Sequence, residues 1–186
     1  MIIVKDDWIS QELQDYLHLV VFGNENINAM LPLQCKVEPT AFDGENPLPV
    51  SFQHVFMSST SHSEWYGNFS KIPQIVCGKI NAELIQILAA RLFITVPHKT
   101  KLEHYAPHTD RPEPHLGLIY YVNDSDGDTL FFEDKSMENN WKPKVIERVS
   151  PKKGRIVLFD GSHLHAGGYP TNTPRCIVNY NIVAER

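Results

Sequence analysis

Two parts of the first half of the chain carry hydrophobic residues with a helical period. Between Asp7 and His18 the apolar positions fall on one face of a helix: Trp8, Ile9, Leu13, Tyr16 and Leu17. Asp6 or Asp7 precedes this pattern and is suited to cap the helix N-terminus. A wider apolar stripe from Ser70 to about Leu92 predicts a second, longer helix. Residues 30–68 are rich in Pro, Ser, Gly and Asn and predict loops with short strands.

Beyond residue 92 the pattern changes to short segments rich in β-branched and aromatic residues. These segments are residues 93–96, 116–122, 129–132, 145–149, 155–159 and 176–183. Turn sequences such as Asn123–Gly127 and Pro170–Pro174 separate them. Many short strands with regular turns are typical of a sandwich or a jelly roll. We therefore predict a mainly β (α+β) fold in one domain, residues 1–186, with a helical and loop part (1–92) packed against a jelly-roll core (93–186).

Composition narrows the class of protein. A chain of 186 residues that is 42% hydrophobic is suited to one compact domain, and it has no apolar run of the ~20 residues that a membrane span needs. The net charge of −5 and the lack of a long Lys/Arg run disfavour an extended nucleic-acid or membrane surface. Three scattered cysteines form no disulfide framework, and the charged N-terminus is no signal peptide. We expect a cytoplasmic protein.

The sequence His108-Thr109-Asp110 carries the main chemical signal. In an extended segment, residues i and i+2 point to the same side, so His108 and Asp110 can present a ring nitrogen and a carboxylate to one metal ion. With a third ligand from another strand, this set suits Fe(II) and leaves open positions for a cosubstrate and O2. A rival motif, His62-Ser63-Glu64, has no matching pattern downstream and ranks below it.

Four motifs then follow one another between about Glu103 and Val183. They are the HxD at 108–110, Gly127–Phe132, Gly154–Phe159, and a histidine followed by Arg175. In this order they resemble the Fe(II)/2-oxoglutarate-dependent dioxygenase superfamily, and most closely its prolyl-4-hydroxylase-like branch. The resemblance implies a double-stranded β-helix (jelly roll). It also implies a hydroxylase that uses Fe(II), 2-oxoglutarate and O2 and releases succinate and CO2.

By this resemblance, His108, Asp110 and His165 would bind Fe(II). His163 competes for the third place, because it lies on the same side as His165 in an extended segment. The family places its basic residue about ten positions after the ligand, and Arg175 stands ten after His165. This spacing favours His165.

The resemblance also implies a cosubstrate site. Arg175 would grip the far carboxylate of 2-oxoglutarate bidentately, with help from the hydroxyl of Thr129. One of Tyr105, Tyr120 and Tyr121 is expected to donate a hydrogen bond to the cosubstrate, and Tyr120 is our candidate. The prolyl-4-hydroxylase branch commonly has Lys where this chain has Arg175. That departure weakens any assignment of peptidyl proline as the substrate.

Other residues near the motif are candidates for the substrate mouth. Arg111 and His115 follow the HxD, and Asn179 and Asn181 alternate on the last predicted strand, so they share a face. The prime substrate, a peptide side chain or a small molecule, is not identified by the sequence, and neither is the oligomeric state. Two alternatives stay open: a cupin-like metal- or ligand-binding jelly roll without oxygenase activity, and a structural jelly roll that binds no metal.

Overall fold

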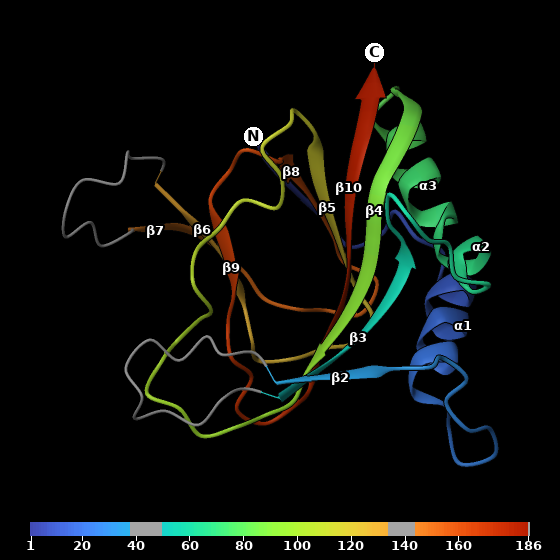
Figure 1. Ribbon diagram of the computed structural model, residues 1–186, viewed down its shortest axis with the longest axis vertical. Coiled ribbons are helices and arrows are strands. Elements are labelled where there is room, and N and C mark those ends of the chain that lie inside the picture. Colours follow the sequence, from blue (N-terminus) through green and yellow to red (C-terminus); the bar gives the residue numbers. More distant parts are fainter. Residues whose placement is uncertain (38–49, 134–143, 186) are drawn as a thin grey trace.

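Two antiparallel sheets face each other in the computed structural model, which describes residues 1–37, 50–133 and 144–185 (Figure 1). Within those ranges the larger sheet has seven strands in the order β1-β8-β5-β10-β4-β3-β2. The smaller sheet has three strands in the order β7-β6-β9. This pair of sheets forms a jelly roll, and the predicted mainly β class is confirmed.

The strands of the larger sheet come from both halves of the chain. They are β1 (Ile2–Lys5), β2 (Gln34–Val37), β3 (Val50–Met57), β4 (Glu83–Thr95), β5 (Leu116–Tyr121), β8 (Ile156–Asp160) and β10 (Arg175–Glu185). The smaller sheet consists of β6 (Thr129–Phe132), β7 (Val145–Val149) and β9 (His165–Gly167). The predicted boundary at residue 92 is therefore wrong as a structural division, because β4 runs through it and β1, β2 and β3 belong to the same sheet.

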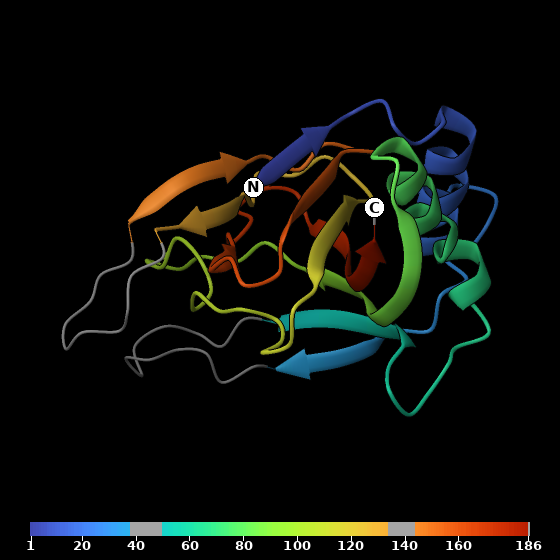
Figure 2. The ribbon, with the colours of Figure 1, turned by 90° about the horizontal axis from the view of Figure 1, so that it is seen from above.

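Three helices in the described part of the chain cover the outer face of the larger sheet (Figures 1 and 2). They are α1 (Gln11–Phe22), α2 (Tyr66–Phe69) and α3 (Lys71–Lys79). Their buried residues, among them Leu17, Phe69 and Val76, pack on the sheet and form its main hydrophobic core. The prediction that N-terminal helices pack against the β-domain is confirmed. Among the described residues, no helix is long and apolar enough to cross a membrane.

The first helix begins later than its sequence pattern suggested. Ser10 is its N-cap, and the Ser10 hydroxyl accepts a hydrogen bond from the Leu13 backbone N–H. The cap predicted at Asp6 or Asp7 is wrong because Asp6 forms ion pairs with Arg155 and Lys152 instead. These pairs tie the end of β1 to the loop before β8.

The second predicted helix, Ser70 to Leu92, is half right. α3 ends at Lys79, Asn81 adopts a left-handed conformation with φ of 53°, and β4 then begins at Glu83. The apolar residues between 84 and 92 fit either period, and pairing with β10 on one side and β3 on the other decides for a strand. Residues 30–68 contain β2, β3 and connecting loops, as expected, and also the start of α2, which was not predicted; residues 38–49 lie outside the described residues.

Strand β5 separates two hydrophobic cores. Leu118 and Tyr120 point to the helices and join the larger core, whereas Ile119 and Tyr121 point between the two sheets. The same alternation along β10 sends Arg175, Ile177, Asn179 and Asn181 to the space between the sheets. This inner face carries the polar residues, and it holds the candidate site.

Candidate active site

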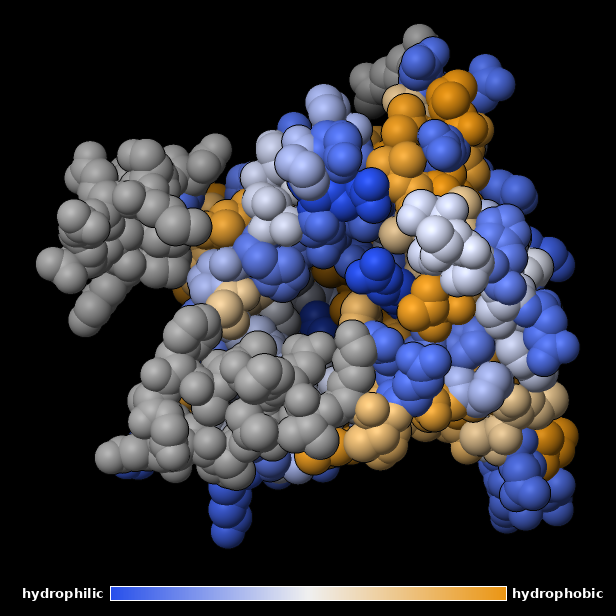
Figure 3. Space-filling view, in the orientation of Figure 1, coloured by the Kyte–Doolittle hydropathy of each residue, from blue (hydrophilic) through white to orange (hydrophobic). Residues whose placement is uncertain are grey.

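A cavity of about 480 Å³ opens between the two sheets. Its walls come from β3, β4, β5 and β10 of the larger sheet, from β6 and β9 of the smaller one, and from residues 105–111. Figure 3 shows hydrophilic side chains around a hollow on this face of the molecule. The buried hydrophobic cluster of Ile119, Tyr121, Phe131 and Phe159 closes the space between the sheets at its inner side.

The two histidines of the motif lie directly opposite each other. The His108 N–H donates to the His165 carbonyl at 2.9 Å, and the His165 N–H donates to the His108 carbonyl at 3.0 Å. This isolated antiparallel bridge joins the segment before β5 to β9 and holds the two ring centroids 4.9 Å apart. The bridge is thus what brings together two residues separated by more than fifty positions in the sequence.

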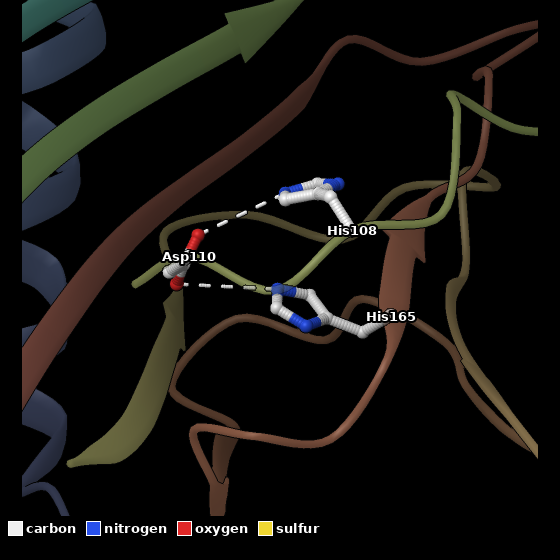
Figure 4. A group of neighbouring side chains, drawn as sticks. All are labelled: His108, Asp110 and His165. Carbon is white, nitrogen blue, oxygen red and sulfur yellow. Dashed lines mark ion pairs between the residues drawn. The ribbon is translucent and has the colours of Figure 1, made fainter. Parts of the chain in front are cut away.

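Asp110 completes a triangle with these two rings (Figure 4). Its Oδ1 lies 3.8 Å from His108 Nε2, and its Oδ2 lies 4.0 Å from His165 Nε2. One ligand atom from each of the three residues lies within 4.8 Å of the others. Two imidazoles and one carboxylate on one side of a space match a facial iron triad.

Backbone carbonyls fix which nitrogen of each ring faces the centre. His108 Nδ1 lies 3.0 Å from the Ala106 carbonyl, and His165 Nδ1 lies 3.0 Å from the His163 carbonyl. A carbonyl can only accept, so each neutral ring carries its proton on Nδ1 and leaves the Nε2 lone pair free to bind a metal. Burial lowers the pKa of His165 despite the neighbouring Asp110, which favours the neutral, ligating form.

Two asparagines from β10 orient Asp110. Asn179 and Asn181 each donate a side-chain N–H to Asp110 Oδ2, at 2.8 Å and 2.7 Å. Burial tends to raise the pKa of Asp110, but His165 and these two hydrogen bonds together hold it below its ordinary value. The carboxylate is therefore charged and fixed in direction, and the predicted shared face of Asn179 and Asn181 is the one that faces the cavity.

The other sequence candidates for metal ligands lie elsewhere. His165 lines the cavity and belongs to the triangle, while His163 is in neither set. The His163 ring instead packs edge-on against Phe131 at 5.8 Å. His62 stacks on Tyr66 at the start of α2, away from the cavity-lining residues. The geometry therefore favours His165 as the third ligand.

Arg175 lies in the same cavity at the start of β10. It is only 4% exposed, its Nε donates to the Gly127 carbonyl at 2.8 Å, and its terminal nitrogen donates to Thr129 Oγ1 at 2.7 Å. Burial lowers the pKa of Arg175 from its very high ordinary value. Among the described residues, no carboxylate lies within ion-pairing distance of this guanidinium. A buried guanidinium without an anion is costly, so this position is suited to an anionic ligand.

The tyrosines near Arg175 are Tyr121 and Tyr105, and the candidate Tyr120 is wrong. The Tyr121 hydroxyl donates to Thr129 Oγ1 at 2.6 Å, and its ring lies 5.9 Å from the Arg175 guanidinium carbon. Tyr120 is fully buried on the opposite face of β5, in the core beneath the helices. Burial raises the pKa of both phenols, so both stay protonated. Tyr105 lines the cavity, and its backbone N–H donates to the carbonyl of Gly167, the residue that borders Arg175.

Two glycines make room for the Arg175 side chain. A Cβ added at Gly127 would lie 2.8 Å from the Gly168 carbonyl oxygen and 3.0 Å from Arg175 Cδ. A Cβ at Gly167 would lie 3.3 Å from an Arg175 terminal nitrogen. Neither role is evident from the sequence, although the Gly127–Phe132 motif contains the first of these residues.

Comparison with known proteins agrees with this geometry. Residues 95–183 match the model of the 2OG-Fe(II) oxygenase superfamily, and no curated protein sequence is significantly similar to the chain. Among solved structures, an oxidoreductase of the 2OG-Fe(II) oxygenase family from Burkholderia pseudomallei is similar with a TM-score of 0.67. It is 12% identical, over 97% of this chain and 84% of that one.

Two prolyl hydroxylases share the fold. A prolyl-4-hydroxylase from Pseudomonas putida has a TM-score of 0.58 at 11% identity, over 100% of this chain and 92% of that one. A prolyl hydroxylase from Trichoplax adhaerens, solved with a hypoxia inducible factor peptide, has a TM-score of 0.60 at 12% identity, over 97% and 82%. The matched segment, residues 95–183, contains the HxD motif, His165 and Arg175 and belongs to the 2OG-Fe(II) oxygenase superfamily, and the chain has the fold of the prolyl-4-hydroxylase-like branch of that superfamily.

Proposed function

We propose that His108, Asp110 and His165 bind Fe(II) in this 2-oxoglutarate-dependent dioxygenase. The observation that carries the proposal is the triangle of Nε2, Nε2 and carboxylate atoms within 4.8 Å, with both Nδ1 atoms occupied by backbone carbonyls. Three protein ligands on one side leave the opposite positions open for a cosubstrate. Together, bound Fe(II), 2-oxoglutarate and O2 supply the chemistry that hydroxylates a C–H bond with release of succinate and CO2.

Arg175 and Thr129 are the proposed site for the far carboxylate of 2-oxoglutarate. The guanidinium is buried, its orientation is fixed by the Gly127 carbonyl and Thr129, and it lacks a carboxylate partner among the described residues. A planar guanidinium can bind a carboxylate with two parallel hydrogen bonds. The Tyr121 hydroxyl donates to Thr129 Oγ1, and the Arg175 terminal N–H donates to the same atom, so the Thr129 hydroxyl proton is free for the cosubstrate.

Neighbouring side chains also hold the proposed metal ligands in place. Phe159 lies edge-on to the His165 ring at 4.9 Å and Phe131 lies 6.2 Å away, so aromatic side chains fix that ligand from behind. Asn179 and Asn181 direct Asp110 Oδ2, which leaves Oδ1 toward His108. His108, with 52% of its side chain exposed, marks the open side from which a prime substrate enters.

The test is an anaerobic titration of the purified protein with Fe(II) and 2-oxoglutarate, followed by the weak visible charge-transfer band of the chelate. We expect a band in the wild type and in His163→Ala, and none in His108→Ala or His165→Ala. His163→Ala is the matched control because it removes a histidine two residues from the proposed ligand. Absence of iron binding in the wild type would refute the proposal.

The cupin-like alternative makes a different prediction for the same titration. A jelly roll that binds only a metal does not need a buried guanidinium. In this chain Arg175 is buried and lines the cavity, and no carboxylate among the described residues pairs with it. Metal binding without any 2-oxoglutarate chelate would support that alternative. Chelation that is lost in Arg175→Ala would exclude it.

A further inference from the structure

A second arginine, Arg91, lines the same cavity at its open side. It lies on β4, its side chain is exposed, and no described carboxylate lies within ion-pairing distance of it. Arg111 also lines the cavity, but Glu113 lies 3.2 Å from its Nε and supplies a partner. Arg91 is thus the cavity-lining cation on the described chain that has neither a partner nor a role in the proposed iron and cosubstrate sites.

The register of β4 against β10 separates Arg91 from the cosubstrate arginine. Thr95 pairs with Arg175, and Arg91 pairs with Asn179. Four residues of strand at about 3.3 Å each put the Arg91 and Arg175 backbones about 13 Å apart along the sheet. The carboxylate that Arg175 holds is therefore out of reach of Arg91. The two arginines therefore form two anion sites.

The same register puts Arg91 level with the metal site. Its partner on β10, Asn179, donates directly to Asp110 Oδ2, and the Cα atoms of paired residues in antiparallel strands lie about 5 Å apart. An anionic group bound by Arg91 would therefore lie beside the proposed iron. The carbon to be hydroxylated and the anionic group would then belong to the same short part of the substrate.

The charges of the proposed iron and cosubstrate complex balance without Arg91. Fe(II), the Asp110 carboxylate, the two carboxylates of 2-oxoglutarate and the Arg175 guanidinium together have no net charge. Arg91 then adds a single positive charge at the mouth of the cavity. A negative charge on the incoming substrate would balance it.

We infer that the prime substrate carries a carboxylate or phosphate group, and that Arg91 binds this group beside the iron. The inference rests on the proposed function, because it takes the Asp110 region as the metal site and Arg175 as the cosubstrate site. Arg91 is a specificity-determining residue in this view: it selects anionic substrates and has no part in binding 2-oxoglutarate. The overall net charge of −5 does not oppose the inference, since one local cation meets one anionic group.

The experiment compares matched probes that differ by charge. The Fe(II) and 2-oxoglutarate complex is titrated anaerobically, by calorimetry, with N-acetyl amino acids against their primary amides, and with alkyl phosphates against the corresponding alcohols. The wild type should bind the anionic member of a pair about tenfold more tightly, as for one charge-assisted contact. The carboxylate and phosphate arms show which anion the site takes.

Three variants assign the preference to Arg91. Arg91→Gln should abolish it, Arg91→Lys should keep most of it, and Lys79→Gln, an exposed change on α3 behind the sheet, should leave it unchanged. Arg91→Gln should chelate 2-oxoglutarate as the wild type does. The inference would be overturned if the wild type bound charged and neutral probes equally tightly, or bound none of them. It would also be overturned if Arg91→Gln kept the preference for the anionic probe. Failure of the chelate itself to form would refute the proposed function instead.

Discussion

Replacing Arg175 with Met separates binding of the cosubstrate from stability of the fold. Met has nearly the same length as the aliphatic part of Arg and occupies the space of that part without a charge. In the structure the guanidinium is 4% exposed and contacts the Gly127 carbonyl and Thr129 Oγ1. The substitution therefore removes a buried charge and two hydrogen bonds, and it leaves the metal triangle in place.

The loss in 2-oxoglutarate binding follows from the bonds removed. A guanidinium that binds a carboxylate through two charge-assisted hydrogen bonds contributes about 3 kcal/mol or more, which corresponds to about a hundredfold in affinity. The metal chelate and the Thr129 hydroxyl are retained in the variant. We therefore expect 2-oxoglutarate to bind to Arg175→Met about a hundredfold more weakly, with unchanged affinity for the metal.

The effect on stability should be much smaller. The Gly127 carbonyl loses its donor, which costs about 1–3 kcal/mol, whereas Thr129 Oγ1 keeps the Tyr121 hydroxyl. Removal of an unpaired buried charge offsets this cost, because desolvation of such a charge takes several kcal/mol. The metal-free variant should differ from the wild type by less than about 2 kcal/mol in its free energy of unfolding.

Two measurements check this pair of expectations. Anaerobic titration of the Fe(II) protein with 2-oxoglutarate gives the affinity, and urea denaturation of the metal-free protein gives the stability. Arg148→Met, which removes an exposed arginine paired with Glu103, is the control and should change neither by much. Affinity within a few-fold of the wild type in Arg175→Met would refute the assigned role. Global unfolding of the variant would refute the claim that the buried charge is kept for binding.

Three further changes test other parts of the site and fold. The double variant Asn179→Leu, Asn181→Leu should bind the metal about 10- to 100-fold more weakly, because Asp110 loses both hydrogen-bond donors. Competition with a chelator measures this affinity, and an unchanged value would argue against the orienting role of the two asparagines. Gly127→Ala should raise the KM for 2-oxoglutarate at least several-fold, because the added Cβ would clash with the Gly168 carbonyl and with Arg175. Steady-state kinetics measures this, and an unchanged KM would contradict the role of Gly127 in making room for Arg175. Asp6→Asn should cost only a few tenths of a kcal/mol at neutral pH, because the ion pair is largely solvated.

The loss of stability expected for Asp6→Asn becomes smaller as the pH falls. The hydrogen bond from Arg155 lowers the pKa of Asp6 from 3.8 to about 2, so the stabilisation is complete above pH 4 and disappears as the pH falls toward 2. Urea denaturation of the wild type and Asp6→Asn along this range should therefore converge at the acid end. A difference that grew toward low pH would contradict the assignment.

Strand alternation limits what the sequence shows about the tyrosines. Leu116–Tyr121 is buried on both faces, so its residues show no alternation between apolar and polar character. Tyr120 and Tyr121 are then equivalent in the sequence, and only the helices packed on one face send Tyr120 into the core. Segment 84–92 is ambiguous for a related reason, since its apolar residues satisfy both a helix and a strand until β3 and β10 pair with it.

The features that depend on local geometry could be predicted from residue spacing alone. His108 and Asp110 are two positions apart in an extended segment, and the short strands with their turns required a β-fold. Tertiary structure decided which distant residues complete the site. The backbone bridge between His108 and His165 favours His165 over His163, and the pairing of β4 with β10 places Arg91 opposite Asn179, which binds Asp110. These contacts join residues tens of positions apart, and the packing of strands fixes them where sequence spacing does not.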